Sequence, residues 1–132
     1  MATLAELRQE YASTRDAIAK LDAELSREWN EIEDKAFEQQ RAKTRDENIR
    51  QDEIEQAEDE LTERLKDFAL RHLKNINNAD DLDDLNRKIA TIKSNLDNTL
   101  NRLRDLERYA AKVAKVAEAV GKVVEKAADI VL

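Results

Sequence analysis

The chain of 132 residues contains no proline, no cysteine and one glycine, and only 4% of it is aromatic. Proline and glycine usually mark loops and turns, so their near absence leaves little of the chain for anything but helix. Aromatic and β-branched residues are few before Val113, which argues against a β-sheet. The composition therefore predicts an all-α protein, and the length predicts a single domain covering residues 1–132.

The absence of cysteine excludes a disulfide framework and thiol chemistry. The lack of disulfides is common in cytosolic proteins. The first residues, MATLAELRQEY, lack the basic and apolar regions of a signal peptide. We therefore expect a cytoplasmic location, with secretion by a route that needs no signal peptide left open.

Long apolar runs are also absent, because 40% of the residues are charged. The Val- and Ala-rich end, Tyr109–Leu132, has no uncharged run near the roughly 18 residues of a membrane span. Acidic residues outnumber basic ones by 30 to 23, and the net charge is −7. Nucleic-acid binding depends on a basic face that neutralises phosphates, so we expect no nucleic-acid partner.

Residues that carry chemistry are scarce. The only histidine, His72, lies on an apolar seam, and Ala69 stands where the Glu-x-x-His motif of di-iron bundles needs a glutamate. One glycine cannot form a glycine-rich phosphate loop. The acidic stretch NADDLDD lacks the glycine and closing glutamate of a calcium loop. We expect no catalytic site, metal site or cofactor, no small-molecule substrate, and no enzymatic activity.

What the sequence does contain is helical periodicity. Thr3 and Glu6 form a capping-box pattern. Mostly apolar residues then recur in steps of three and four along 18–40 and again along 54–76, with the nearly all-polar stretch 38–53 between them. From Leu82 onward, apolar residues hold a heptad pattern over seven heptads, which is typical of a coiled coil. We predict a helix over 3–76, a turn at 77–79 in which an asparagine is left-handed, and a helix over 80–131.

A short turn between two long helices predicts an elongated antiparallel hairpin. Folding about residue 79 places the acidic run 52–63 beside residues 95–106, which contain Arg102 and Arg104. It also places the lysines of 112–126 beside the acidic residues of 31–38.

The last third of the second helix has an apolar face about twice as wide as a two-stranded seam, and residues 1–26 overhang it. A lone hairpin would leave both bare, at a cost of roughly 1.5–3 kcal/mol for each large apolar side chain. We therefore expect association with a second chain to complete a bundle. The interface residues we assign are Leu4, Leu7, Tyr11, Ile18, Leu21, Leu25, Trp29, Val113, Val116, Val120, Gly121, Val123, Val124 and Ile130.

The alternative fold is a three-helix bundle, in which the first helix breaks near RAKTRDE and Thr44 and Glu47 form a second capping box. For function, we expect a coiled-coil interaction module, acting as a scaffold, adaptor or chaperone-like binder. Its partner would be a second copy or another helical protein. The alternative function is a membrane-active protein working through its C-terminal helix, although a Val/Ala face with mixed charges makes a membrane partner the weaker expectation.

Overall fold

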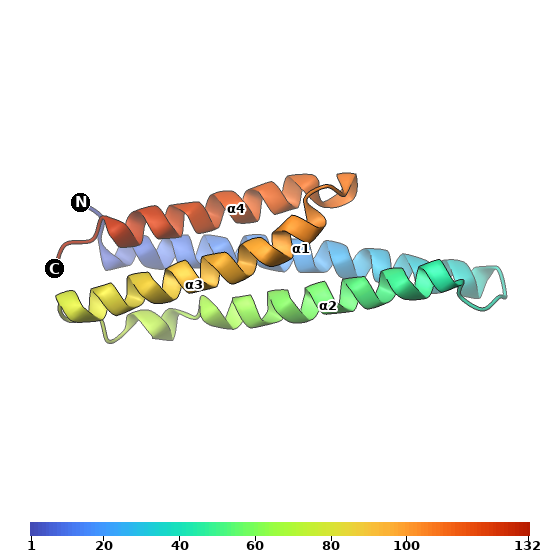
Figure 1. Cartoon of the computed structure of the whole chain (residues 1–132), viewed down its shortest axis with the longest axis horizontal. Helices are drawn as coiled ribbons and strands as arrows, with labels where there is room; N and C mark the ends of the chain where they lie inside the picture. Colours follow the sequence, from blue (N-terminus) through green and yellow to red (C-terminus); the bar gives the residue numbers. More distant parts are fainter.

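The computed structural model describes all residues, Met1–Leu132, and confirms the all-α class. Four α-helices and one short 3-10 helix pack side by side, with both termini at the same end (Figure 1). In chain order they are α1 (Leu4–Glu38), α2 (Arg45–Asp67), η1 (Leu70–Leu73), α3 (Ala79–Leu103) and α4 (Glu107–Ala128). Each α-helix runs antiparallel to the next, as in an up-down-up-down bundle.

Helix α1 begins as the sequence predicts. The Thr3 hydroxyl accepts a hydrogen bond from the Glu6 backbone N–H at 3.2 Å. The apolar residues that recur in steps of three and four then form one continuous buried face, which includes Leu7, Ile18, Leu21 and Leu25. The helix has 35 residues, about 50 Å of rise, where an unbroken helix to residue 76 would approach about 110 Å.

The prediction of an unbroken first helix is wrong, because the chain reverses between Glu38 and Arg45. Gln40 takes a left-handed conformation (φ 49°), the only positive φ in the chain. The second capping box is present, with Thr44 and Glu47 each bonding the other's backbone. Residues 38–53 have almost no apolar side chain to bury, so polar contacts close this turn without glycine or proline.

The one reversal that we predict, at 77–79, is present but extends over more residues than expected. Helix α2 ends at Asp67, and η1 and a loop lead to α3. Phe68 is fully buried and meets the Tyr11 ring edge-on at 5.2 Å between centroids, so burial against α1 draws this segment off the α2 axis. No asparagine is left-handed here. Asn78 instead caps α3, accepting from the Asp81 N–H at 2.9 Å.

The predicted helix over 80–131 is also wrong, because the chain turns back at Arg104–Leu106. Leu106 is extended (ψ 115°) and has no side-chain cap, so no local signal ends α3. The heptad pattern continues through the turn because both α3 and α4 face the same core. The three-helix alternative therefore has the right kind of break but one helix too few.

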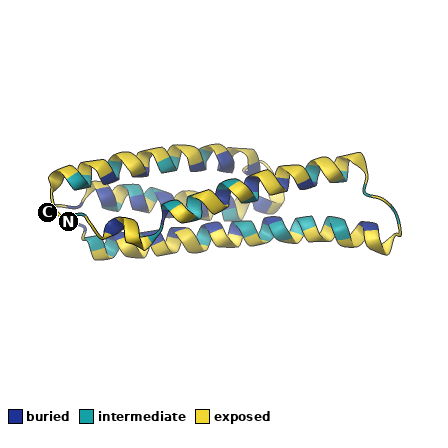
Figure 2. Ribbon diagram, turned by 90° about the horizontal axis from the view of Figure 1, so that it is seen from below, coloured by how far each residue is buried: buried dark blue, intermediate teal, exposed yellow.

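The covering of the wide apolar face explains this topology. α4 packs between α1 and α3, and the buried residues of all four helices face inward (Figure 2). Val116 and Val123 on α4 are fully buried within the one chain. Burial of this face thus requires no second chain, and oligomerisation stays a prediction. None of the helices combines the length and apolar character needed to span a bilayer.

We expect Gln40→Gly to raise the free energy of unfolding by about 0.5–1 kcal/mol. A left-handed residue with a Cβ costs about 1–2 kcal/mol, and glycine returns about half of this through its freedom in the unfolded chain. Urea unfolding followed by circular dichroism measures the change. Gln39→Gly is the control, because Gln39 has negative φ (−84°) and gains nothing from glycine. A loss of stability in Gln40→Gly would contradict this account of the turn.

Candidate binding surfaces

The residues assigned to an interface between chains lie together in the structure, but within one chain. Leu7, Tyr11 and Ile18 of α1 are buried in the same core cluster as Val116 and Val120 of α4. The premise that a lone chain leaves them bare is therefore wrong. A contact between chains through these residues stays a prediction, and it would require α1 and α4 to separate.

Four of the assigned residues are only partly covered, namely Leu4, Trp29, Gly121 and Val124. Gly121 is the only glycine in the chain. A Cβ added at this position would meet nothing within 4 Å, so no element of the same chain packs closely there.

The antiparallel pairing of charges that the sequence predicts is present between α2 and α3. Glu60 of the acidic run accepts a hydrogen bond from Thr99 at 2.8 Å and pairs with Arg102. The predicted pairing of α4 is wrong, because the turn after α3 sends α4 back along α1. Lys126 therefore pairs with Glu6 at 3.2 Å and not with the acidic residues of 31–38.

A charged cluster joins the start of α4 to the middle of α1. The Tyr109 hydroxyl donates to Glu28 at 2.7 Å, and Arg50 of α2 donates to both oxygens of the same carboxylate at 2.5 and 3.0 Å. Arg108 bridges Glu24 and Glu31 at 2.8 and 2.7 Å. Burial would raise the pKa of Glu28, but its hydrogen bonds to Arg50 and Tyr109 lower that pKa overall.

Beyond this cluster, α1 and α2 continue as a two-helix hairpin past the ends of α3 and α4 (Figure 1). We call residues 33–49 the distal hairpin. Gln51, at its base, is buried and donates to the Trp29 carbonyl at 3.2 Å and to Glu33 at 3.0 Å. Lys43 pairs with Glu33 and lies 5.9 Å from the centre of the Trp29 ring. These contacts join the two helices of the hairpin at its base.

The distal hairpin exposes a large aromatic side chain. Phe37, in the last turn of α1, is 85% exposed, whereas the preceding Ala36 is buried. Phe37 stands off the apolar seam by one residue, so a search for helical periodicity does not find it. An off-seam aromatic residue beside a polar segment is the sequence signal that could have identified it.

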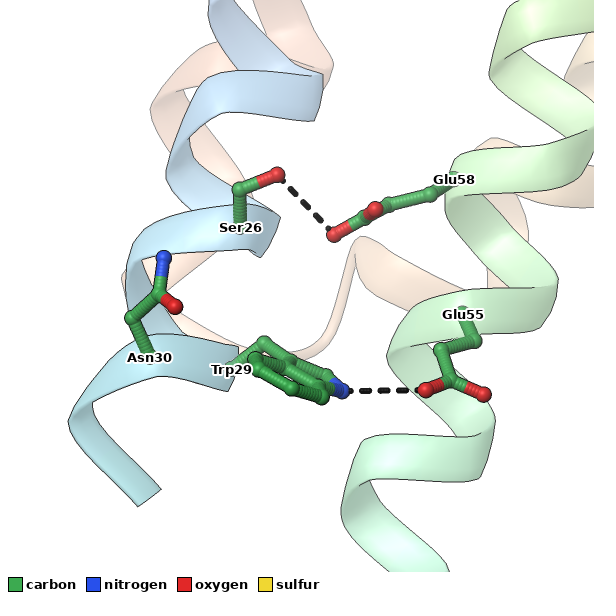
Figure 3. A pocket seen from close by; sticks show the side chains of 5 residues that line it. All are labelled: Ser26, Trp29, Asn30, Glu55 and Glu58. Atoms are coloured by element: carbon green, nitrogen blue, oxygen red, sulfur yellow. Dashed lines mark hydrogen bonds between the residues drawn. The ribbon is translucent and has the colours of Figure 1, made fainter. Parts of the chain in front are cut away.

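On one side of the hairpin base, α1 and α2 enclose a polar pocket of about 200 Å³ (Figure 3). The Trp29 indole N–H donates to Glu55 at 3.1 Å, and the Ser26 hydroxyl donates to Glu58 at 3.1 Å. Trp29 packs against the core cluster and also lines the edge of this pocket, with Asn30 beside it.

Two carboxyl groups near this pocket are poorly compensated. Asp22 has one buried oxygen with no hydrogen-bond partner, and burial raises its pKa. Burial also raises the pKa of Glu58, and the nearby charge of Asp22 raises it further. The pair therefore binds protons more readily than ordinary carboxyl groups do.

A larger cavity, about 490 Å³, lies at the end of the bundle that carries the termini, where η1 and its loop face α3. Tyr11, Ile76, Leu85 and Ile92 form its apolar wall. Charged side chains from α2, η1 and α3 surround the opening. His72 also lines it, and this side chain is exposed and not packed on a seam as its spacing predicts. These side chains converge from separate elements, so no spacing in the sequence indicates the cavity.

No protein-family model, curated protein or solved structure matches this chain.

We expect Asp22→Asn to raise the free energy of unfolding at pH 7 by up to about 1 kcal/mol, since it removes a charge whose burial is uncompensated. A carboxyl with a raised pKa in the folded state lowers stability above that pKa, and this loss disappears as the pH falls through it. The difference in the free energy of unfolding between Asp22→Asn and the unmutated protein should therefore vanish at about pH 3.

Urea titrations at the two pH values measure this effect. Asp16→Asn is the matched control, because Asp16 is an exposed carboxylate paired with Lys20 on the same helix, and such pairs contribute little. Equal effects of the two variants, or an advantage of Asp22→Asn that persists in acid, would contradict the assignment.

Proposed function

We propose that this protein is a non-enzymatic helical interaction module that binds a protein partner through the distal hairpin. Phe37 carries the proposal, since it is 85% exposed at the end of a hairpin that projects from the bundle. Large aromatic side chains contribute much of the binding energy at protein interfaces when a partner buries them. A scaffold, adaptor or chaperone-like binder would use such a projecting contact.

Preorganisation of the hairpin supports the proposal. Arg41 donates to both carboxylate oxygens of Glu47 at 2.7 and 3.2 Å, and Glu47 also accepts from the Thr44 backbone N–H at 2.9 Å. With the contacts of Lys43 and Gln51, these bonds hold the turn before any partner arrives. Binding of a partner therefore requires little further ordering of the loop, and this small entropy cost favours high affinity.

The proposed partner is a second copy of this chain or another helical protein. The alternative, a membrane-active protein, would use the valine side chains of α4. Val116, Val120 and Val123 are buried in the core, so lipid could reach them only after the bundle opened. No such step is needed for a partner that docks on Phe37.

We expect Phe37→Ser to weaken partner binding by about tenfold or more, because losing an aromatic contact at the centre of an interface costs at least about 1–2 kcal/mol. For self-association, light scattering after size exclusion over a concentration series measures the dimer population. The unmutated protein should shift from monomer to dimer at concentrations where Phe37→Ser remains a monomer.

For a different partner, a photo-crosslinking phenylalanine analogue at position 37 should capture one discrete protein in cells of the native source. The same analogue at Lys115, an exposed position of α4, is the control. Equal crosslinking at both positions, combined with a monomer mass throughout the concentration series, would refute the proposal. Ile49→Ser, at a second exposed apolar residue of the distal hairpin, tests whether the contact extends along α2.

A further inference from the structure

The charges around the cavity of about 490 Å³ are unequally satisfied. Its three carboxylates each have a partner in the chain. Asp67 pairs with Arg64 at 3.0 Å, and Asp84 pairs with Arg87 at 3.2 Å. Asp81 accepts a hydrogen bond from the Asn77 backbone N–H at 3.0 Å. Asp67 and Asp84 therefore each have a cationic partner in the chain, and Asp81 has a neutral donor.

The two cationic side chains that line the same cavity have no partner of opposite charge in the chain. Arg71 of η1 and Lys88 of α3 line it, and neither has a carboxylate within ion-pair distance. Both side chains are exposed, and they come from two different elements. An unpaired guanidinium and an unpaired ammonium that converge on one cavity favour an anionic ligand, and the guanidinium can bind a carboxylate with two hydrogen bonds.

Tyr11 supplies the third donor. Its side chain is 1% exposed and lines the cavity, yet its hydroxyl has no hydrogen-bond partner in the chain. Tyr109, the other tyrosine, donates to Glu28 at 2.7 Å. Burial, with the charge of Asp67, raises the pKa of Tyr11 to about 12, so the hydroxyl keeps its proton at neutral pH. The hydroxyl is not sealed from water, because Asp22 Oδ1 is the fully buried side-chain atom that lacks a partner, so the Tyr11 O–H is free to donate to a molecule in the cavity.

We propose that this cavity binds a small organic anion, with its carboxylate held by Arg71 and Lys88 and its apolar body lying on Tyr11, Leu85 and Ile92. The volume is within the range of small-molecule sites, about 300–1,000 Å³, and the mixture of an apolar wall with a few polar groups is typical of them. The proposal is independent of the partner binding assigned to Phe37, which lies in the distal hairpin at the other end of the molecule.

Octanoate is the probe, since it combines a carboxylate with a short apolar chain. It should raise the melting temperature of the full chain saturably, as a ligand that binds only the folded state does, and calorimetry should find one site per chain. Octylammonium carries the same chain with the opposite charge. It should bind at least about tenfold more weakly if the unpaired cations define the site.

Two variants and one control test the residues. Arg71→Gln with Lys88→Gln should weaken octanoate binding at least about tenfold, and Tyr11→Phe should weaken it less while it retains the buried ring. Lys115→Gln with Lys122→Gln makes the same change of net charge on α4 and should leave octanoate binding unchanged. Circular dichroism melting without ligand establishes that each variant is folded.

Several results would overturn the proposal. One is the absence of saturable octanoate binding by the unmutated protein. Another is octylammonium binding as tightly as octanoate, which would show that the three carboxylates dominate the site. A third is an equal loss of octanoate binding in the variant at the cavity and in the control variant on α4, which would indicate only a response to net charge. If Tyr11→Phe fails to fold, the double variant at Arg71 and Lys88 decides the question alone.

Discussion

The valine face of α4 must be covered, and α1 is the helix that covers it. Removing a valine side chain from water contributes roughly 1.5 kcal/mol or more, so the several valines of this face together rival the net stability of a small domain. α4 can reach α1 only if the chain reverses after α3, and α3 then closes the bundle against α2. The break at Arg104–Leu106 is thus a consequence of burial and needs no turn residue of its own.

Polar side chains shape the parts of the molecule that have little core. Gln40 is left-handed without being glycine, and the contacts that Arg41 and Lys43, which follow it in the turn, make with α2 hold it there. The cluster around Glu28 then connects α4 to α1 and α2 at the point where the bundle narrows to two helices. Specific hydrogen bonds therefore fix the geometry of the distal hairpin, whereas apolar burial fixes the bundle below it.

Much of the local structure could be predicted from the sequence. The N-cap at Thr3, the capping box of Thr44 and Glu47, and the contact of Glu60 with residues near Arg102 all follow from spacing and are present. The number of helices could not be predicted. A heptad pattern reports which side of a helix is buried, and the residues on either side of Leu106 keep that pattern whether the helix continues or turns back.

The candidate sites were beyond prediction for a related reason. Arg71 and Lys88 are unremarkable surface residues in the sequence, and they converge only because η1 leaves the line of α2 and faces α3. Phe68, buried against Tyr11, is what diverts that segment, and its role depends on a neighbour 57 positions away. Periodicity along one helix carries no information about such contacts.

The meeting of the two chain ends affects how the protein folds. Ala2 donates a backbone hydrogen bond to Asp129, and Lys126 pairs with Glu6, so the last contacts span nearly the whole chain. Helical bundles usually fold fast because their contacts are local, but the α1–α4 contact closes a loop of more than a hundred residues. The α1–α2 and α3–α4 hairpins can each form early through short loops. We expect their docking, which brings α4 onto α1, to be the slow step of folding.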